Sequence, residues 1–255
     1  MEKVVELTNV SMTYHTLDGE THAIQDVSFN IYDSEFVSIV GPSGCGKSTL
    51  LSLVAGLIKP TSGTVKVCGK PVEGTTENVG YMLQKDHLFE WRTILKNAVV
   101  GLEVKKKLNK DTLRYTEQLL KEYGLGDFLH HYPSQLSGGM RQRAALIRTL
   151  ASKPDILLLD EPFSALDYQT RLAISEEIWL ILKKEKKTAI LVTHDIAEAV
   201  AASDRVIVLT SRPATIKNIH EINLTCDIRT PILCREAPEF RRYFNDIWKE
   251  LDVHV

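Results

Sequence analysis

The sequence predicts an α/β fold with a mainly parallel sheet, an antiparallel β layer at the N-terminal end and an inserted helical subdomain. Short runs rich in Val, Ile and Leu alternate with segments of helical periodicity, and several runs are unbroken, as in strands covered on both faces. The first 35 residues and residues 62–72 instead alternate apolar with polar side chains and contain turn residues. That pattern is typical of antiparallel strands.

The apolar runs, several of them unbroken, are predicted to be the strands of the parallel sheet. They are EFVSIV at 35–40, VGYMLQ at 79–84, DILLLD at 155–160, TAILVT at 188–193 and RVIVLT at 205–210. Residues 95–150 contain almost no strand pattern, and helical periodicity at 111–123 and 138–151 predicts an inserted helical subdomain there. Near the end of the chain, one helical face is apolar, which predicts a docking helix. Its apolar residues are Phe240, Phe244, Ile247 and Leu251.

Composition limits the classes of partner. The chain has 255 residues, of which 44% are hydrophobic and 25% charged, as in an ordinary globular protein with a substantial core. With 31 basic and 33 acidic residues, the formal charge of −2 gives no overall attraction to nucleic acid, so no nucleic-acid partner is expected. The four cysteines lack metal-ligand or disulfide-framework spacing, which predicts buried thiols in a reducing compartment. Because no apolar run approaches the roughly 18 residues of a membrane span, a cytosolic chain is expected.

The strongest chemical signal is GPSGCGKST at 41–49, which follows a predicted strand and precedes an apolar helix. It matches G-x-x-x-x-G-K-[ST], the phosphate loop of P-loop NTPases, in the structural context that the motif requires. In such a loop backbone N–H groups surround the phosphates, Lys47 reaches the terminal phosphates and the Ser48 hydroxyl binds magnesium. Cys45 is interpreted as a residue that fills space in the turn and has no reactive role. The predicted nucleotide-binding residues here are Gly41, Pro42, Ser43, Gly44, Cys45, Gly46, Lys47, Ser48 and Thr49.

Polar side chains follow three of the other predicted strands. ILLLDEP ends in Asp160 and Glu161, of which one can orient a magnesium shell while the other polarises an attacking water. Gln84 and His194 also stand at strand ends, where parallel strands bring side chains to one edge. A GTPase would carry Asn-Lys-x-Asp, and NKDT at 109–112 fails at its last position. Nothing in the sequence specifies an acceptor pocket for a small-molecule kinase. ATP hydrolysis is therefore favoured.

A second candidate anion site lies at SQLSGGMRQR, residues 134–143. Ser137 is a good N-cap, and Gly138 and Gly139 allow close approach to the first turn of the predicted helix. An apolar stripe anchors this helix. It consists of Met140, Ala144, Ile147 and Ala151. Core packing accounts for the stripe, but it is not expected to account for two glycines in the first turn.

These motifs, in this order, resemble the nucleotide-binding subunit of ATP-binding-cassette (ABC) transporters over nearly the whole chain. The segments that carry the resemblance are SMTY ending at Tyr14, the phosphate loop, Gln84, LSGGM at 136–140, ILLLDEP at 156–162, SALD at 164–167 and His194. The resemblance implies that Tyr14 stacks on adenine, although a tyrosine after an alternating strand is also typical of a core edge. It assigns Asp167 to the nucleotide site and implies a single domain over 1–255. Within this domain, the β layer and a RecA-like core are formed by residues 1–94 and 152–255, and the helical subdomain is formed by residues 95–151.

The resemblance also implies roles for the strand-end residues. Asp160 supports the magnesium shell, together with Ser48 and Gln84, and Gln84 links the metal site to the membrane-spanning partner. Glu161 acts as general base and His194 senses the terminal phosphate. In this family two subunits face each other head to tail, with each ATP between the phosphate loop of one and the signature of the other. Ser137, Gly138 and Gly139 would therefore bind the nucleotide of the second subunit of a homodimer.

Subgroup features resemble the bacterial importers of nitrate, sulfonate and taurine. They are FEWRTILKNAVVGLE at 89–103, methionine in the signature and SRPATI at 211–216. Glu90 and Ala214 depart from that pattern, where Pro and Gly are typical. The resemblance implies a peripheral subunit on the cytoplasmic face of the membrane, permease subunits as partners and, indirectly, a solute-binding protein.

The partner surface and two alternative functions stay open at this point. Phe89, Trp91 and Ile94 lie where the family receives a short helix of the membrane-spanning subunit, and a core role for Trp91 is an equal alternative. An exporter ATPase would retain every catalytic motif. A soluble ABC ATPase acting on DNA or ribosomes would carry long coiled-coil insertions or a second cassette, and the sequence contains neither.

Overall fold

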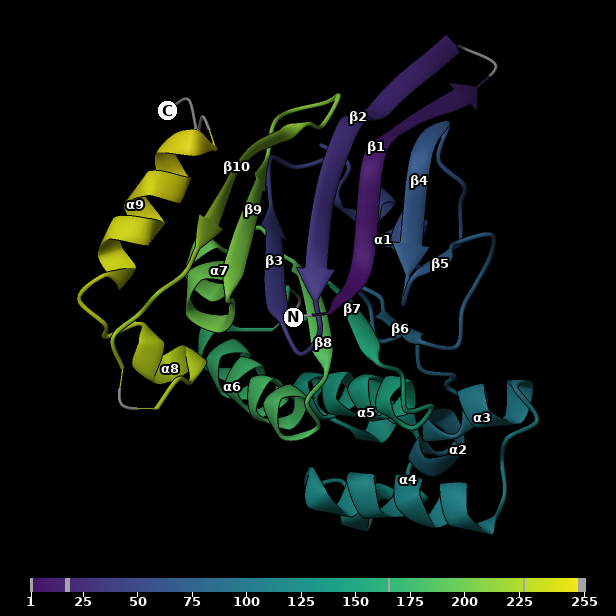
Figure 1. The fold of residues 1–255 in the computed structure, drawn as a ribbon. Coiled ribbons are helices and arrows are strands. Elements are labelled where there is room, and N and C mark those ends of the chain that lie inside the picture. Colours follow the sequence, from purple (N-terminus) through teal and green to yellow (C-terminus); the bar gives the residue numbers. More distant parts are fainter. Residues whose placement is uncertain (1, 17–18, 165, 227, 252–255) are drawn as a thin grey trace.

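The larger sheet forms the centre of the molecule. The structure is a computed structural model that describes residues 2–16, 19–164, 166–226 and 228–251. The strand order is β10-β9-β3-β8-β7-β6, parallel from β9 to β6, with β10 antiparallel to β9 (Figure 1). The strands are β3 (Phe36–Val40), β6 (Val79–Met82), β7 (Ile156–Asp160), β8 (Thr188–Val192), β9 (Arg205–Leu209) and β10 (Ile216–Glu221). Every residue of β3, β7 and β8 is buried, which explains why their sequences are mostly apolar.

The second sheet is antiparallel and comes mostly from the N-terminal residues. Its order is β2-β1-β4-β5, formed by β1 (Lys3–Thr16), β2 (Gly19–Tyr32), β4 (Ser62–Val67) and β5 (Lys70–Pro71). One apolar core joins this sheet to the parallel sheet and to α1 (Lys47–Val54), which carries the buried Leu50, Leu51 and Leu53. The predicted fold class, a mainly parallel sheet beside an N-terminal antiparallel β layer, is confirmed.

Helices fill the chain between β6 and β7. They are α2 (Ile94–Ala98), α3 (Val100–Val104), α4 (Lys110–Glu122) and α5 (Gly138–Leu150), with short 3-10 turns at Gly126–Phe128 and Pro133–Gln135. Figure 1 shows these helices in one half of the molecule and the sheets in the other. Asn109 caps α4 by accepting from the Asp111 and Thr112 backbones. The helices predicted at 111–123 and 138–151 are confirmed to within one residue, while the proposed subdomain boundaries stay a prediction.

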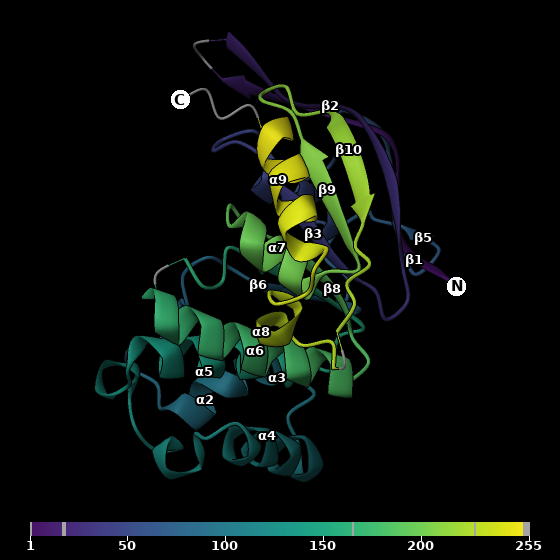
Figure 2. The same ribbon diagram turned by 90° about the vertical axis from the view of Figure 1, so that its left-hand side faces the viewer.

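The C-terminal helix packs against the parallel sheet next to β9 and α7. After α6 (Tyr168–Lys184), α7 (Ile196–Ala202) and α8 (Pro231–Cys234), the chain forms α9 (Phe240–Glu250). Figure 2 shows α9 running along β9 beside α7. Ile247 is fully buried in a cluster with residues of α7 and β9, and Phe240, Phe244 and Leu251 are partly buried against it. The docking helix predicted from these four residues is confirmed.

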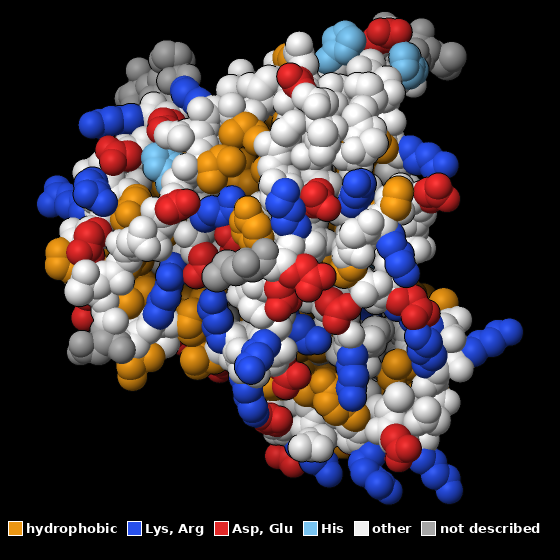
Figure 3. All heavy atoms as spheres, in the orientation of Figure 1, with side chains coloured by type: hydrophobic (Ala, Val, Ile, Leu, Met, Phe, Trp, Pro, Cys, Tyr) orange, Lys and Arg blue, Asp and Glu red, His pale blue; other side chains and the backbone are white. Residues whose placement is uncertain are grey.

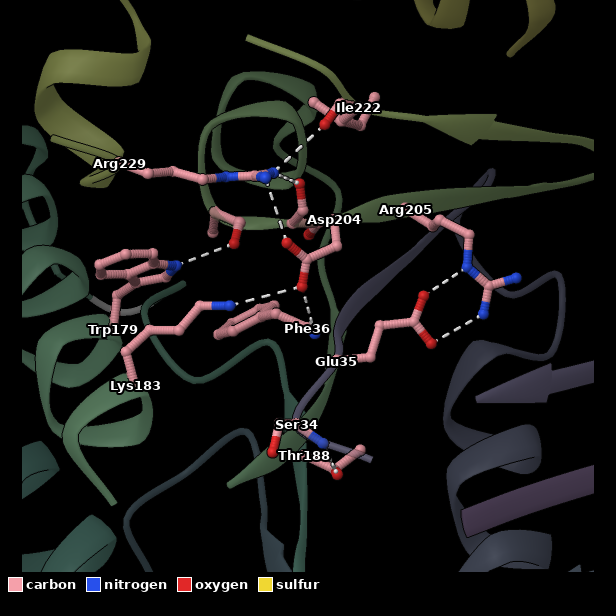
Figure 4. A network of polar contacts seen from close by, with 12 residues as sticks. Ser34, Glu35, Phe36, Trp179, Lys183, Thr188, Asp204, Arg205, Ile222 and Arg229 are labelled. Atoms are coloured by element: carbon pink, nitrogen blue, oxygen red, sulfur yellow. Dashed lines mark hydrogen bonds and ion pairs between the residues drawn. The ribbon is translucent and has the colours of Figure 1, made fainter. Parts of the chain in front are cut away.

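Charged side chains fix the edge of the sheet at which β3 and β9 begin (Figure 4). The Asp204 carboxylate accepts a 2.8 Å hydrogen bond from the Phe36 backbone and pairs with Lys183 at 3.4 Å and Arg229 at 3.2 Å. Glu35 accepts two hydrogen bonds, of 2.5 and 2.9 Å, from the Arg205 guanidinium. This network ties α6 and the segment before α8 to the parallel sheet. It lies at the end of β3 opposite to the phosphate loop.

Composition-based expectations are met in part. Cys45 and Cys234 are buried, but Cys68 and Cys226 are only partly buried, so the expectation of four buried thiols was wrong for two of them. Cys68 lies in the turn between β4 and β5 of the antiparallel sheet, and Cys226 lies in the loop before α8. Figure 3 shows basic and acidic side chains interspersed on one face, as the balanced composition suggests. Among the described helices, none combines the length and apolarity needed to cross a bilayer.

Candidate nucleotide site

The phosphate-loop sequence forms a tight loop between β3 and α1. Gly44 and Gly46 have φ values of +71° and +127°, in the region that favours glycine. A Cβ on Gly46 would stand 3.0 Å from the Ala23 carbonyl oxygen, so a side chain there would also collide with β2. The Lys47 side chain is 6% exposed, and its Nζ donates to the Gly41 and Pro42 carbonyl oxygens at 2.8 and 3.0 Å. The loop thus folds around a buried ammonium group, a charge suited to phosphate oxygens.

Two further loop residues, Cys45 and Thr49, have defined surroundings in the structure. Burial raises the pKa of the Cys45 thiol, which suits a filler of the turn. Thr49 Oγ1 lies 3.3 Å from the hydroxyl of Tyr14, whose side chain is 37% exposed. The Tyr14 ring is therefore next to the first turn of α1 and accessible from solvent, where a planar ligand could stack on it.

Asp160 ends β7 beside the phosphate loop. Ser48 Oγ donates to Asp160 Oδ1 at 3.0 Å, and the Tyr81 hydroxyl donates to Asp160 Oδ2 at 3.1 Å. Burial raises the pKa of Asp160 and also that of Tyr81. A hydroxyl and a carboxylate side by side are oxygen ligands that suit Mg²⁺, so these residues fit a hard divalent cation. Tyr81 was not among the predicted site residues, because its contact with Asp160 depends on β6 and β7 being neighbours.

Glu161, Gln84 and His194 meet at the same edge of the sheet. Gln84 Nε2 donates to Glu161 Oε2 at 3.2 Å, and His194 Nδ1 lies 3.2 Å from the same oxygen. The Glu161 backbone has a φ of +44°, an uncommon conformation for a residue with a side chain and one that is enriched at functional sites. The Glu161 side chain is 22% exposed and that of His194 59%. A partly exposed carboxylate held by an amide and an imidazole can accept a proton from water.

The signature segment forms the first turn of α5. Ser137 is exposed and caps the helix, accepting a 3.3 Å hydrogen bond from the Met140 backbone. A Cβ on Gly139 would lie 3.2 Å from the Thr170 methyl and 3.4 Å from Ile174 of α6. Packing of α5 on α6 therefore favours a small residue at 139. The expectation that packing does not account for these glycines does not hold fully at Gly139.

The signature is separate from the phosphate loop of its own chain. Among the described residues, no hydrogen bond or ion pair joins residues 137–140 to residues 41–49. Asp167 caps α6 by accepting from the Thr170 backbone at 3.1 Å, and this hydrogen bonding lowers the pKa of its carboxyl group. Ala165, within the SALD segment, lies outside the described residues. The structure thus brings together the phosphate loop, Asp160, Glu161, Gln84 and His194, but not the signature.

Glu198, which the sequence did not single out, is a buried carboxyl group close to His194. Glu198 of α7 is 5% exposed and its Oε1 has no hydrogen-bond partner among the described residues. It shares a small cavity with Glu161, Arg171 and His194. Burial raises the pKa of Glu198 to about 7, with Asp195 adding to the shift and the Thr193 hydroxyl, Arg171 and Arg235 opposing it. In the sequence, Glu198 resembles any exposed acidic residue of a helix.

We expect the Glu198→Gln variant to have a higher free energy of unfolding than the parent chain at high pH, where ionised Glu198 destabilises the parent fold. Because the folded protein holds this proton up to about pH 7 while the unfolded chain releases it near pH 4.5, ionisation destabilises the fold as pH rises through that window. The amide cannot ionise, so at pH 8 the free energy of unfolding should exceed that of the parent by about 3 kcal/mol, with little difference at pH 4.5. Urea unfolding at both pH values measures this. Equal differences at both pH values, or the same gain in the exposed control Glu236→Gln, would contradict the prediction.

This fold and site define a P-loop nucleotide hydrolase, because a phosphate loop after one parallel strand faces carboxylates at the ends of others. A family model described as ABC transporter matches residues 24–164. The chain belongs to this ABC transporter family, and it is an ATP-binding subunit that hydrolyses ATP.

Relatives are similar over almost the whole chain. The uncharacterized ABC transporter ATP-binding protein YtlC of Bacillus subtilis is 45% identical over 248 residues, covering 97% of this chain and 95% of YtlC. The nitrate import ATP-binding protein NrtD of Synechocystis is 40% identical, covering 95% and 93%. The taurine import ATP-binding protein TauB of Pelagibacter ubique is 41% identical, covering 82% and 79%.

A solved structure supports the ATPase class. The ATP-binding cassette MJ0796, in a dimeric post-hydrolysis state with ADP and Pi, is 33% identical with a TM-score of 0.75. The match covers 86% of this chain and 99% of that cassette.

Proposed function

We propose that this chain is the ATP-hydrolysing subunit of an ABC importer for a small anion such as nitrate, a sulfonate or taurine. In this proposal it lies peripherally on the cytoplasmic face of the membrane and binds permease subunits, which receive solute from a solute-binding protein. The catalytic part of this proposal rests on one observation. Gln84 and His194 both contact the same carboxylate oxygen of Glu161 beside the phosphate loop. The import direction and the anion class are supported by the similarity to NrtD, a nitrate import protein, and TauB, a taurine import protein.

The proposed roles of the site residues follow from their positions. The loop 41–49 binds the phosphates of ATP, with Lys47 at the terminal phosphates and Tyr14 against the adenine ring. Ser48, Asp160 and Gln84 would hold magnesium, which supplies charge neutralisation of the phosphates when bound. Glu161 polarises the attacking water and His194 orients that carboxylate and contacts the terminal phosphate.

The active unit in this proposal is a homodimer. Ser137, Gly138, Gly139 and Asp167 lie apart from the loop of their own chain, so their proposed ligand is the nucleotide held by the second subunit. The exposed N-cap of α5 offers backbone N–H groups and the positive end of a helix dipole to an anion. The dimer seen for MJ0796 supports this arrangement. ATP then stabilises the closed dimer, because only that state contacts it from both sides, and hydrolysis releases it.

Two exposed aromatic side chains form the proposed permease-binding surface. Trp91 is 76% exposed and Phe89 36% exposed, and their ring centroids lie 5.0 Å apart. Ile94, which was predicted to belong to the same surface, is fully buried as the first residue of α2 and packs inside the helical segment. The surface therefore consists of the two aromatic rings. Exposed aromatic pairs of this kind are typical of binding surfaces.

We expect Trp91→Ala to detach the chain from its membrane partner without changing the basal ATPase rate of the isolated subunit. Truncating an interface tryptophan typically costs about 2 kcal/mol, or a roughly 30-fold loss of affinity. The measurement is the fraction of chain that sediments with membranes containing its permease. Trp248→Ala, at a 46% exposed position on α9, is the matched control. Equal retention of both variants would contradict the assignment of this surface.

The transport activity itself is tested by reconstitution. The chain, its permease and its solute-binding protein are placed in liposomes, and ATP hydrolysis is measured with nitrate, taurine, an alkanesulfonate or maltose. The proposal predicts that one of the anionic or sulfonated solutes stimulates hydrolysis and enters the lumen, whereas maltose does neither. Outward solute movement, or hydrolysis that no membrane partner stimulates, would contradict it.

A further inference from the structure

The loop between β9 and β10 reaches the phosphate loop. β9 pairs with β3 in parallel, with Val40 opposite Val208, so the segments after these two strands leave the sheet at the same edge. The SRPATI segment at 211–216 lies in this loop except for its last residue, Ile216, which begins β10. The Arg212 guanidinium donates to the Gly44 carbonyl oxygen from Nε at 3.2 Å and from Nη2 at 2.9 Å. Both hydrogen bonds go to a single oxygen of the phosphate loop.

The backbone that carries Arg212 is anchored, although its side chain is exposed. Ala214 is fully buried, donates to the Ala23 carbonyl oxygen at 3.0 Å and accepts from the Gln25 backbone at 2.9 Å. The Ala23 oxygen is also the atom nearest to a Cβ placed on Gly46. Strand β2, the loop 210–215 and the phosphate loop therefore meet at one junction. The Arg212 side chain therefore extends from a backbone segment that hydrogen bonds hold in place.

The two hydrogen bonds constrain a peptide group that faces the phosphate site. In a trans peptide the carbonyl oxygen and the N–H point in opposite directions. Because Arg212 binds the Gly44 oxygen, the N–H of Cys45 points away from the arginine and donates to the Pro42 oxygen at 3.3 Å, the same oxygen that accepts from Lys47 Nζ. This hydrogen bond is longer than usual and therefore weak, so a phosphate oxygen can replace Pro42 as the acceptor. The guanidinium also polarises the peptide, which strengthens the N–H as a donor.

We propose that Arg212 is a positioning residue for the polyphosphate chain of a nucleoside triphosphate. It fixes the peptide that joins Gly44 to Cys45 so that the N–H of Cys45 faces the phosphates, and it adds positive charge beside the loop. The inference rests on the proposed role of residues 41–49 as the ATP site. It gives the SRPATI segment a function within the nucleotide site, whereas the sequence indicated only a subgroup marker.

The test compares ATP binding by the full chain with that of three arginine variants. Arg212→Ala should raise the Kd and the KM for ATP about five- to tenfold, because a charged hydrogen-bond donor is lost at a partly solvated site. kcat should stay within about twofold of the parent value, since Arg212 contacts neither Glu161 nor His194. Arg212→Lys should recover much of the affinity through its charge. Arg241→Ala, at an exposed position on α9, should match the parent.

The outcomes separate this inference from the proposed function. A Kd for Arg212→Ala within twofold of the parent, or a loss confined to kcat, would overturn the positioning role. If Arg212→Ala does not fold, Arg212→Lys and Arg212→Gln carry the same comparison, with thermal unfolding of the nucleotide-free chain as the check. Lys47→Ala is measured alongside: normal ATP binding by that variant refutes the proposed nucleotide site, whereas normal binding by Arg212→Ala alone refutes only this inference.

Discussion

The Glu161→Gln variant is expected to bind ATP with the affinity of the parent chain and to hydrolyse it about 1,000-fold more slowly, since general bases typically contribute two to four orders of magnitude. Glutamine keeps the shape of the side chain and an oxygen that can accept the hydrogen bond from Gln84, but it cannot take a proton from water. Because glutamine and glutamate have the same side-chain shape, the exchange adds no steric conflict at the positive φ of residue 161. The loss is therefore expected in kcat alone.

The same variant should accumulate as an ATP-dependent dimer, because the closed state cannot be released by hydrolysis. Size-exclusion chromatography with and without ATP measures this, and steady-state phosphate release measures turnover. Glu185→Gln, in the turn after α6, serves as a control with the same chemical change. Turnover at the parent rate in Glu161→Gln would show that another group accepts the proton.

The Lys47→Ala variant is expected to lose nucleotide binding itself. The Lys47 ammonium is almost fully buried against two loop carbonyls, and it is the cation placed to meet terminal phosphates. Charge-assisted hydrogen bonds of this kind typically contribute up to about 3 kcal/mol, so the Kd for ATP should rise roughly 100-fold. Equilibrium titration with a fluorescent ATP analogue measures the change.

A matched variant separates the loss of charge from the loss of packing in the loop. Lys47→Met keeps the length and the apolar stem of the side chain, and it should bind ATP as poorly as Lys47→Ala. Thermal unfolding without nucleotide reports whether the loop still folds. An unchanged Kd in a folded variant would refute the assignment of residues 41–49 to the phosphates.

The phosphate loop and the strands could be predicted because their signals are local. GPSGCGKST is contiguous, and the positive φ values of Gly44 and Gly46 are what its glycines suggest. Strands β3, β7 and β8 are buried on both faces, so each is a mostly apolar run that can be recognised without any knowledge of its neighbours. Glu161 and His194 could be placed together because both follow such strands.

The remaining site features depend on contacts between segments that are distant in sequence. Tyr81 reaches Asp160 only because β6 pairs with β7, and Arg212 reaches Gly44 only because β9 pairs with β3. Burial of Glu198 depends on how α7 packs, which a single acidic residue in a helix does not reveal. The glycine at 139 has two explanations that the sequence cannot separate, since ligand approach and the packing of α5 on α6 both favour a small residue there. These features required the tertiary structure.

The central claim is that each ATP site is shared between two chains, and mixed dimers test it most directly. A Ser137→Arg subunit keeps its phosphate loop and a Lys47→Ala subunit keeps its signature, so a heterodimer has one intact shared site. Each variant alone is expected to be inactive. Mixing them in equal amounts should restore up to about a quarter of the parent ATPase activity, since half of the dimers are mixed and each has one of two sites. If mixing restores no activity while both variants remain folded and dimeric, each site belongs to a single chain and the claim is wrong.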